Sequence, residues 1–444
     1  MKKFLMFLLS AVMAVSIFGA LGGCGGAVKL TVVSPFHTGD GNRTNFVNAY
    51  KAYEEASGNT IVDKSAESNE YWKKGVTADF KNNKEPDILF YFTGAGAKEF
   101  INDKKVVAIS EIRKKYKYYA GNMKDELMPV APDGRQYAVP VNGFWEGLFV
   151  NKKVLADCGL ELPGADYTWE QFLADCQIIK DKGYAPVACS LKEVPHYWFE
   201  FCTLNNGTLA NHLDLPKTVG DAASLKWAKG LEDIKTLYYA GFFPDNTLTA
   251  GDAETCRLML EDKAAFLIDG SWKVGYFQTV QDIADNTSDP KFADTIKGLK
   301  LEGMDFSKYS INNYAVAYIP AKGERKAAEI ISGFSMGYYI TKKAWDNPKK
   351  QKACVEFIMT MTTDDVVSAF GTLSSTALKE EKKETPADAS ELIKSALAMY
   401  NGNTGSKGAV QDLVEDDPRA EFFASFASVV SNTMTPADAI KKVY

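Results

Sequence analysis

Short apolar stretches alternate with longer amphipathic ones along the first part of the chain. Residues 28–33 alternate in the manner of a half-buried strand, and the continuous apolar run that follows Pro86-Asp87 is typical of a buried one. We expect strands at 28–33, 61–63 and 88–91, and helices at 46–56 and 71–81. Strands that alternate with helices predict βαβ units and a largely parallel sheet.

The same alternation continues through the rest of the chain, which becomes rich in helical spacing toward its end. We expect strands at 148–150 and 264–268, and helices at 169–181, 225–239, 253–262, 350–362, 389–400 and 421–432. Thr168, followed three residues later by Gln171, predicts a capping box at the start of helix 169–181. Residues 401–408 are rich in Gly and Asn and predict an exposed loop.

The first residues have the pattern of a targeting segment. Lys2 and Lys3 precede an apolar run at 4–21, which ends in Gly22-Gly23-Cys24. This order is typical of a secretory signal peptide, and a Cys directly after small residues resembles the bacterial lipobox, in which the chain is cut before a lipid-bearing Cys. An uncleaved membrane anchor is the alternative, because about 18 apolar residues just span a bilayer. We predict that residues 1–23 are a signal peptide, that Cys24 is lipidated, and that the protein lies outside the cytoplasm, anchored to the cell membrane.

Composition and net charge indicate a globular protein and exclude one class of partner. The hydrophobic fraction of 46% and charged fraction of 24% are those of an ordinary globular protein, and the length allows two domains. The net charge of -6 argues against nucleic-acid binding, which needs a basic surface.

Reactive motifs do not combine into a catalytic or metal site. The cysteines after Cys24 form no CxxC motif and do not have the spacing of zinc ligands, so we expect most of them in the core. The alternative is a disulfide among Cys158, Cys176, Cys189 and Cys202. Residues 333–337 match GxSxG, the motif around the nucleophile of α/β-hydrolases. The catalytic histidine of those enzymes follows the serine in the chain, whereas every histidine here precedes Ser335. We therefore predict a protein without enzymatic activity, metal or cofactor.

Five segments, in order, resemble the extracellular solute-binding proteins of family 1, the sugar-binding lipoproteins that serve ABC importers. They are PDILFYF at 86–92, DGRQYAVP with GLFVNK at 133–152, TWEQF at 168–172, AAF with GSW at 264–272, and GYYITKK at 337–343. The resemblance implies an α/β fold of two periplasmic-binding-protein-like lobes, with a hinge between them that lets the lobes close on ligand. Lobe 1 is expected at 28–141 plus 338–377 and lobe 2 at 144–334 plus 385–444, with a ligand cleft between them; residues 282–312 match nothing in this pattern.

The resemblance also implies a function. The protein is expected to be a monomer that captures a mono- or oligosaccharide and delivers it to ABC permease subunits in the membrane. The same architecture with a polyamine, a polyol phosphate or a peptide as ligand is the alternative. Arg43 is the main cation among the candidates for a phosphate, and Asp40 and Asp269 are the acids that a polyamine would need.

A sugar presents hydroxyls and a face of C–H groups, so its site combines aromatic planes with polar side chains. We expect aromatic contacts from Trp272, Trp198, Tyr197, Trp145, Tyr91, Phe92, Phe36, Trp72 and Tyr338, and polar contacts from Asp40, Arg43 and Asp269. Trp272 is the strongest candidate, because the resemblance implies a stacking aromatic directly after Gly270-Ser271. The alternative is packing for the aromatic residues and a solvated loop for Asp40 and Arg43.

Overall fold

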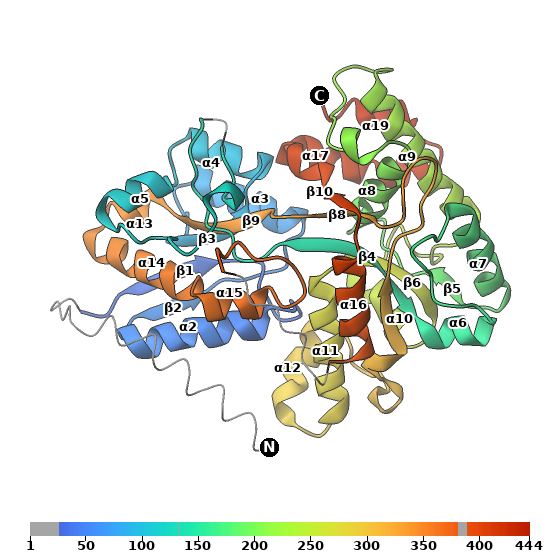
Figure 1. The fold of residues 1–444 in the computed structure, drawn as a ribbon, viewed down its shortest axis with the longest axis horizontal. Helices are drawn as coiled ribbons and strands as arrows, with labels where there is room; N and C mark the ends of the chain where they lie inside the picture. The colour runs from blue at the N-terminus through green and yellow to red at the C-terminus, as the bar shows by residue number, and fades with distance from the viewer. Residues whose placement is uncertain (1–25, 132, 381–388) are drawn as a thin grey trace.

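The computed structural model describes residues 26–131, 133–380 and 389–444, so the predicted signal peptide and Cys24 lie outside the described residues. Figure 1 shows two lobes side by side, each built around its own β-sheet with helices on both faces. Within the described ranges, no helix is long and apolar enough to cross a membrane.

Lobe 1 contains a four-stranded sheet in the order β2-β1-β3-β9. Its elements are β1 (Lys29–Val33), α2 (Arg43–Ser57), β2 (Thr60–Asp63), α3 (Glu70–Lys81), β3 (Ile88–Phe92), η2 (Ala95–Ala97), α4 (Lys98–Asn102), α5 (Ile109–Lys115), η3 (Asp125–Leu127), β9 (Met336–Ile340), α13 (Lys342–Trp345), α14 (Pro348–Met361) and α15 (Asp364–Phe370). Successive residues of β3 alternate between two hydrophobic clusters, because neighbouring side chains of a strand point to opposite faces. The sheet is therefore covered by helices on both sides.

Lobe 2 contains a larger sheet in the order β10-β8-β4-β6-β5, with β7 also paired to β4. Its elements are β4 (Phe144–Asn151), α6 (Lys152–Cys158), α7 (Trp169–Asp181), β5 (Ala185–Val187), α8 (Pro195–Asn205), η4 (Leu209–Asn211), α9 (Ala222–Tyr239), α10 (Asp252–Leu260), β6 (Ala264–Gly270), α11 (Trp272–Asp285), η5 (Pro290–Phe292), α12 (Ala293–Gly298), η6 (Phe306–Lys308), η7 (Ile311–Asn313), β7 (Tyr314–Ala317), β8 (Glu329–Gly333), α16 (Glu391–Asn401), β10 (Gly405–Lys407), η8 (Val410–Leu413), α17 (Asp416–Ala424), α18 (Phe426–Val430) and α19 (Pro436–Ile440).

The prediction of a largely parallel sheet holds in lobe 1, where β1 runs parallel to β2 and β3. It also holds in lobe 2, where β10 runs parallel to β8 and β5 to β6, with the exception of β4. There β4 is antiparallel to β6, β7 and β8. The reason is the route of the chain: β4 leads from the lobe junction into lobe 2, whereas β6 and β8 lead back toward it.

Two further expectations are corrected in the C-terminal part. Residues 401–408 are not wholly a loop, because β10 pairs in parallel with β8 from Gly405↔Glu329 to Lys407↔Ile331. The helix expected at 421–432 is interrupted at Ser425, whose hydroxyl donates to the Phe422 carbonyl, and becomes α17 and α18. Neither feature could be predicted from hydrophobic periodicity. The pairing of β10 uses backbone hydrogen bonds, and the helix is interrupted by a side chain that competes for a helical carbonyl.

The lobes are joined where β4 begins, where β8 passes into β9, and by the segment after α15. The Gly143 amide donates to the Ser375 carbonyl at 2.8 Å, and Val139 bridges to Tyr338. Residues 282–312, which had no predicted place, form the end of α11, then α12 and η5 to η7, and add Leu301 to the core of lobe 2. The six cysteines of the described chain are buried and free, as expected for core residues.

Candidate functional site

A group of aromatic rings lies at the edge of lobe 2 that meets lobe 1. The half-buried Trp272, in the first turn of α11, has Phe144 at 6.4 Å and Tyr197 at 6.3 Å between ring centroids. A Cβ on Gly270 would fall 2.2 Å from the Trp272 indole, so only glycine at this position leaves room for the ring. The indole therefore occupies the place of a side chain on the end of β6.

Glu146 lies beside this ring. It is the antiparallel register partner of Gly270, and register partners have side chains on the same face of a sheet. The Glu146 side chain is buried, and its Oε2 has no hydrogen-bond partner among the described residues. Its pKa is raised well above the ordinary value, first because burial disfavours the charged form and then because Glu200, Asp412 and Asp269 lie near it.

The loop of lobe 1 that contains Gly41 lies against the backbone of Trp272 and Gly275. A Cβ on Gly41 would lie 2.6 Å from the Trp272 carbonyl oxygen, and one on Gly275 would lie 2.2 Å from the Gly41 Cα. Leu299, at the end of α12, would come within 2.6 Å of a Cβ on Gly39. The loop that contains Asp40 is thus pressed against α11 and α12, and glycines permit that approach.

A buried ion-pair triad supports the start of α11. Lys273 lies 2.8 Å from Asp269 and 3.0 Å from Asp252 between charged atoms. Burial alone would lower the Lys273 pKa, but the two carboxylates raise it well above its ordinary value. Lys273 is therefore a cation whose charge is already compensated.

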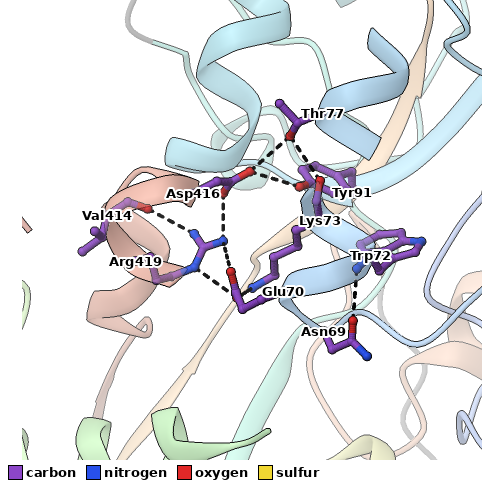
Figure 2. A network of polar contacts seen from close by, with 9 residues as sticks. All are labelled: Asn69, Glu70, Trp72, Lys73, Thr77, Tyr91, Val414, Asp416 and Arg419. Atoms are coloured by element: carbon purple, nitrogen blue, oxygen red, sulfur yellow. Dashed lines mark hydrogen bonds and ion pairs between the residues drawn. The ribbon is translucent and has the colours of Figure 1, made fainter. Parts of the chain in front are cut away.

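A second contact between the lobes is a polar network of α3 and β3 with α17, which Figure 2 shows. Arg419 of α17 pairs with Glu70 of α3 at 3.3 Å and with Asp416 of its own helix at 2.8 Å. The hydroxyls of Thr77 and Tyr91 donate to Asp416, both at 3.4 Å, and Lys73 pairs with Glu70 at 2.7 Å. Glu70 therefore sits between two cations, one from each lobe.

The charges of this network perturb their neighbours. Burial raises the pKa of Glu70 less than Lys73 and Arg419 lower it, so its pKa falls to about 2. The pKa of His196, at the start of α8, falls to about 3, because burial disfavours its cation and Lys73 repels it. His196 is thus held neutral within a charged interface.

Two cavities lie near these groups. One of about 530 Å³ lies between α3, α4 and α17 and is lined by Thr77 and Asp416 of the polar network. A larger one, of about 790 Å³, lies on lobe 2 between α11, η7 and α16, away from the aromatic group. In the described part of the chain, no group of His, Cys, Asp and Glu side chains is arranged to hold a metal ion.

The structure divides the predicted site residues into those at the lobe interface and those elsewhere. Trp272, Tyr197, Asp269 and Asp40 lie around α11, and Tyr91, Phe92 and Trp72 lie around α3 and the polar network. Arg43 instead makes contacts within lobe 1: its guanidinium donates to Asp63 at 2.6 Å and to the Phe36 carbonyl at 2.8 Å.

Tyr91 and Tyr197 belong to the hydrophobic clusters as well as to these contacts, and four other predicted residues lie in the hydrophobic cores. Trp198 is 2% exposed and packs on Phe172 and Phe243, and Trp145 is fully buried with its indole N–H donating to the Leu373 carbonyl. Phe36 and Tyr338 both pack on Phe90 inside lobe 1. The packing alternative describes these four in the structure, and they are left out of the site proposed below.

Sequence reasoning missed Glu146, Glu70 and Arg419. Glu146 did carry a signal, because it is an acid within an otherwise apolar strand, FWEGLFV. Glu70 and Arg419 carried none, since they lie 349 residues apart in the chain.

Comparison with known proteins identifies the family. The model of the bacterial extracellular solute-binding proteins matches residues 41–366. None of the curated proteins matches the chain.

Solved structures share the fold at low sequence identity. A chitin oligosaccharide binding protein superimposes with a TM-score of 0.76 at 21% identity, over 94% of this chain and 98% of that one. A bacterial solute receptor, AcbH, with an exclusive preference for β-D-galactopyranose has a TM-score of 0.69 at 15% identity, over 94% and 98%. The GacH receptor of Streptomyces glaucescens, solved unliganded and with acarbose, has a TM-score of 0.66 at 15% identity, over 94% and 96%. With the family model, this fold establishes that the chain belongs to the bacterial extracellular solute-binding proteins.

Proposed function

We propose that this protein is a lipid-anchored, non-enzymatic receptor that binds a mono- or oligosaccharide between its lobes and delivers it to an ABC permease. The observation that carries the proposal is the half-buried Trp272, which lies between Phe144 and Tyr197 and beside the unpartnered carboxyl of Glu146. An aromatic plane suits the C–H face of a sugar ring, and a carboxyl suits its hydroxyls.

The position of this group between two lobes supports capture by closure. Ligand contacts to both lobes favour the closed form over the open one, because a ligand shifts an equilibrium by its differential affinity for the two states. Here the loop with Asp40 from lobe 1 lies against the first turn of α11 from lobe 2, so a solute on Trp272 lies within reach of both. Three neighbours in fold are named for saccharide or sugar-like ligands, which agrees with this proposal.

A charged ligand is the second candidate, and the acids at the interface favour a cation over an anion. Glu146 and Asp412 lie near the aromatic group or the network, whereas Lys273, Lys73 and Arg419 already have carboxylate partners. A polyol phosphate would find no uncompensated cation among these three. We therefore retain a polyamine as the alternative solute.

A thermal-shift screen of the purified protein tests the proposal. The panel contains chito-, xylo-, galacto- and malto-oligosaccharides, their monosaccharides, spermidine, glycerol phosphate and a peptide mixture. A ligand at about 100 times its dissociation constant stabilises the folded protein by about 2.7 kcal/mol, which raises the melting temperature by several degrees. Stabilisation by a saccharide is the expected result, and stabilisation by a non-sugar alone would contradict the saccharide assignment.

A further inference from the structure

The carboxyl of Glu146 stands apart from the other acids around it. It is 2% exposed, at the point where β4 leaves the lobe junction, and its Oε2 has no hydrogen-bond partner within the described chain. A buried polar group without a partner is costly, so an unpartnered carboxyl beside the half-buried Trp272 indicates a missing ligand atom.

Two of its acidic neighbours, Glu200 and Asp269, have partners inside the protein. Glu200 accepts from the amides of Val410 and Gln411 at 2.9 and 2.8 Å and contacts His212 Nε2 at 3.1 Å. Asp269 pairs with Lys273 at 2.8 Å, whereas burial raises the pKa of Asp412 to about 6 although Lys73 and Arg419 lower it. Glu146 is therefore a buried member of this acidic group whose Oε2 no described cation or donor satisfies.

We propose that Glu146 receives an ammonium group of the bound solute, and that the solute is an amino sugar. This inference rests on the proposed function and narrows its ligand class. A neutral hydroxyl could exchange hydrogen bonds with the carboxyl, whereas an ammonium supplies a donor and also a countercharge for Glu146 and the acids around it.

The aromatic rings around Glu146 support the same chemistry. Trp272 has the rings of Phe144 and Tyr197 as neighbours, and the faces of aromatic rings attract cations. The sugar ring would lie against the indole while its ammonium reaches the carboxyl. Without solute, the raised pKa of Glu146 favours its protonated form, so binding an ammonium releases this proton to solvent. A linear polyamine has the same ammonium chemistry, and the test separates the two sources.

Calorimetric titration of the wild-type protein and of Glu146→Gln tests the inference. The probes are a glucosamine trimer, an N-acetylglucosamine trimer, maltotriose and spermidine, each titrated in two buffers of different ionisation enthalpy to count released protons. The glucosamine trimer should bind the wild type at least about tenfold more tightly than its N-acetylated form, with close to one proton released. Glu146→Gln should abolish both the preference and the proton release. Glu170→Gln, at an exposed position on α7, is the matched control and should change neither.

The other outcomes are distinct. Tighter binding of the N-acetylated trimer or maltotriose, unchanged in Glu146→Gln, overturns the inference and leaves the saccharide proposal standing. Binding of spermidine alone, lost in Glu146→Gln, upholds the ammonium contact and overturns the saccharide proposal. Failure of both amines to bind overturns the inference. Glu146→Gln loses no internal partner, so its melting temperature should not fall, and an unfolded variant would contradict the absence of such a partner.

Discussion

At the scale of single residues, Trp272 is the side chain on which the proposed stacking contact depends. Trp272→Ala should lower saccharide affinity by about 5- to 150-fold, the equivalent of about 1–3 kcal/mol of lost contact. Calorimetry with the saccharide found in the thermal-shift screen measures this change. Tyr118→Ala, which removes an aromatic ring that is 84% exposed, is the matched control and should leave affinity unchanged. Equal affinity of folded Trp272→Ala and wild type would remove Trp272 from the site.

Asp40 provides a residue-scale test through pH. Burial raises the pKa of Asp40 to about 7, so the folded protein keeps a proton that an unfolded Asp loses near pH 3.9. Its contribution to stability is therefore present at acid pH and lost as pH rises from about 4 to 7. Asp40→Asn stays neutral and keeps an oxygen for the Asn42 amide. The melting temperature of Asp40→Asn relative to wild type should increase between pH 4.5 and 7 and level off above it.

The control for this pH series is Asp79→Asn, at an exposed position on α3. Its melting temperature should differ from that of the wild type by a similar amount at every pH. A pH-independent difference for Asp40→Asn as well would show that the pKa of Asp40 is not raised in the folded protein.

Single residues differ in how well the sequence predicts them. The capping box of Thr168 and Gln171 is present with both hydrogen bonds, because it depends on residues only three positions apart. Trp272 and Tyr197 were predicted together, and the structure brings their rings to 6.3 Å. Trp198, one residue later, lies in the core, since adjacent helical residues point in different directions. Spacing alone does not say which of two neighbouring aromatics faces the interface.

At the scale of elements, the contact of α3 with α17 joins lobes that are far apart in the chain. Glu70 is the only carboxylate that the described structure places between Lys73 and Arg419 as a partner of both. Glu70→Gln would leave two cations facing each other in the closed form, whereas opening the lobes separates them. We expect the closed form to lose about 1–3 kcal/mol, so that solute affinity falls by about 5- to 150-fold through the smaller closed population.

The measurement is the dissociation constant together with the dissociation rate, which should rise in Glu70→Gln. Glu99→Gln is the matched control, because Glu99 pairs with Lys81 within lobe 1 and leaves the lobe contact intact. Equal affinities for wild type and Glu70→Gln would show that this network does not support closure.

Elements with strong periodicity could be predicted, and elements that depend on pairing could not. Helix 169–181 was predicted with the bounds of α7, because an amphipathic pattern and a cap define it locally. Strand β10 was missed, since its three residues pair through backbone atoms with β8 and carry no apolar pattern. The direction of β4 relative to its neighbours was missed for the same reason: pairing is a property of the tertiary fold.

At the scale of the whole molecule, the resemblance to solute-binding proteins implied the two-lobe fold, and the family model and solved structures confirm it. How the lobes touch did not follow from the sequence. Gly41 and Gly275 meet in the structure, as do Glu70 and Arg419, and each pair joins segments separated by more than two hundred residues. The predicted residue limits of the lobes, the lipid on Cys24 and the permease remain predictions of this account.

Hydrogen exchange of the protein with and without its saccharide tests whether the solute is held between the lobes, because it reports both lobes at once. Binding between the lobes should slow exchange in residues 36–43 and 69–73 of lobe 1 and in residues 144–147 and 270–273 of lobe 2 at the same saccharide concentration. Helix α7, far from the interface, should exchange at an unchanged rate. Protection of one lobe alone, or of neither lobe at saturating saccharide, would contradict a solute held between them.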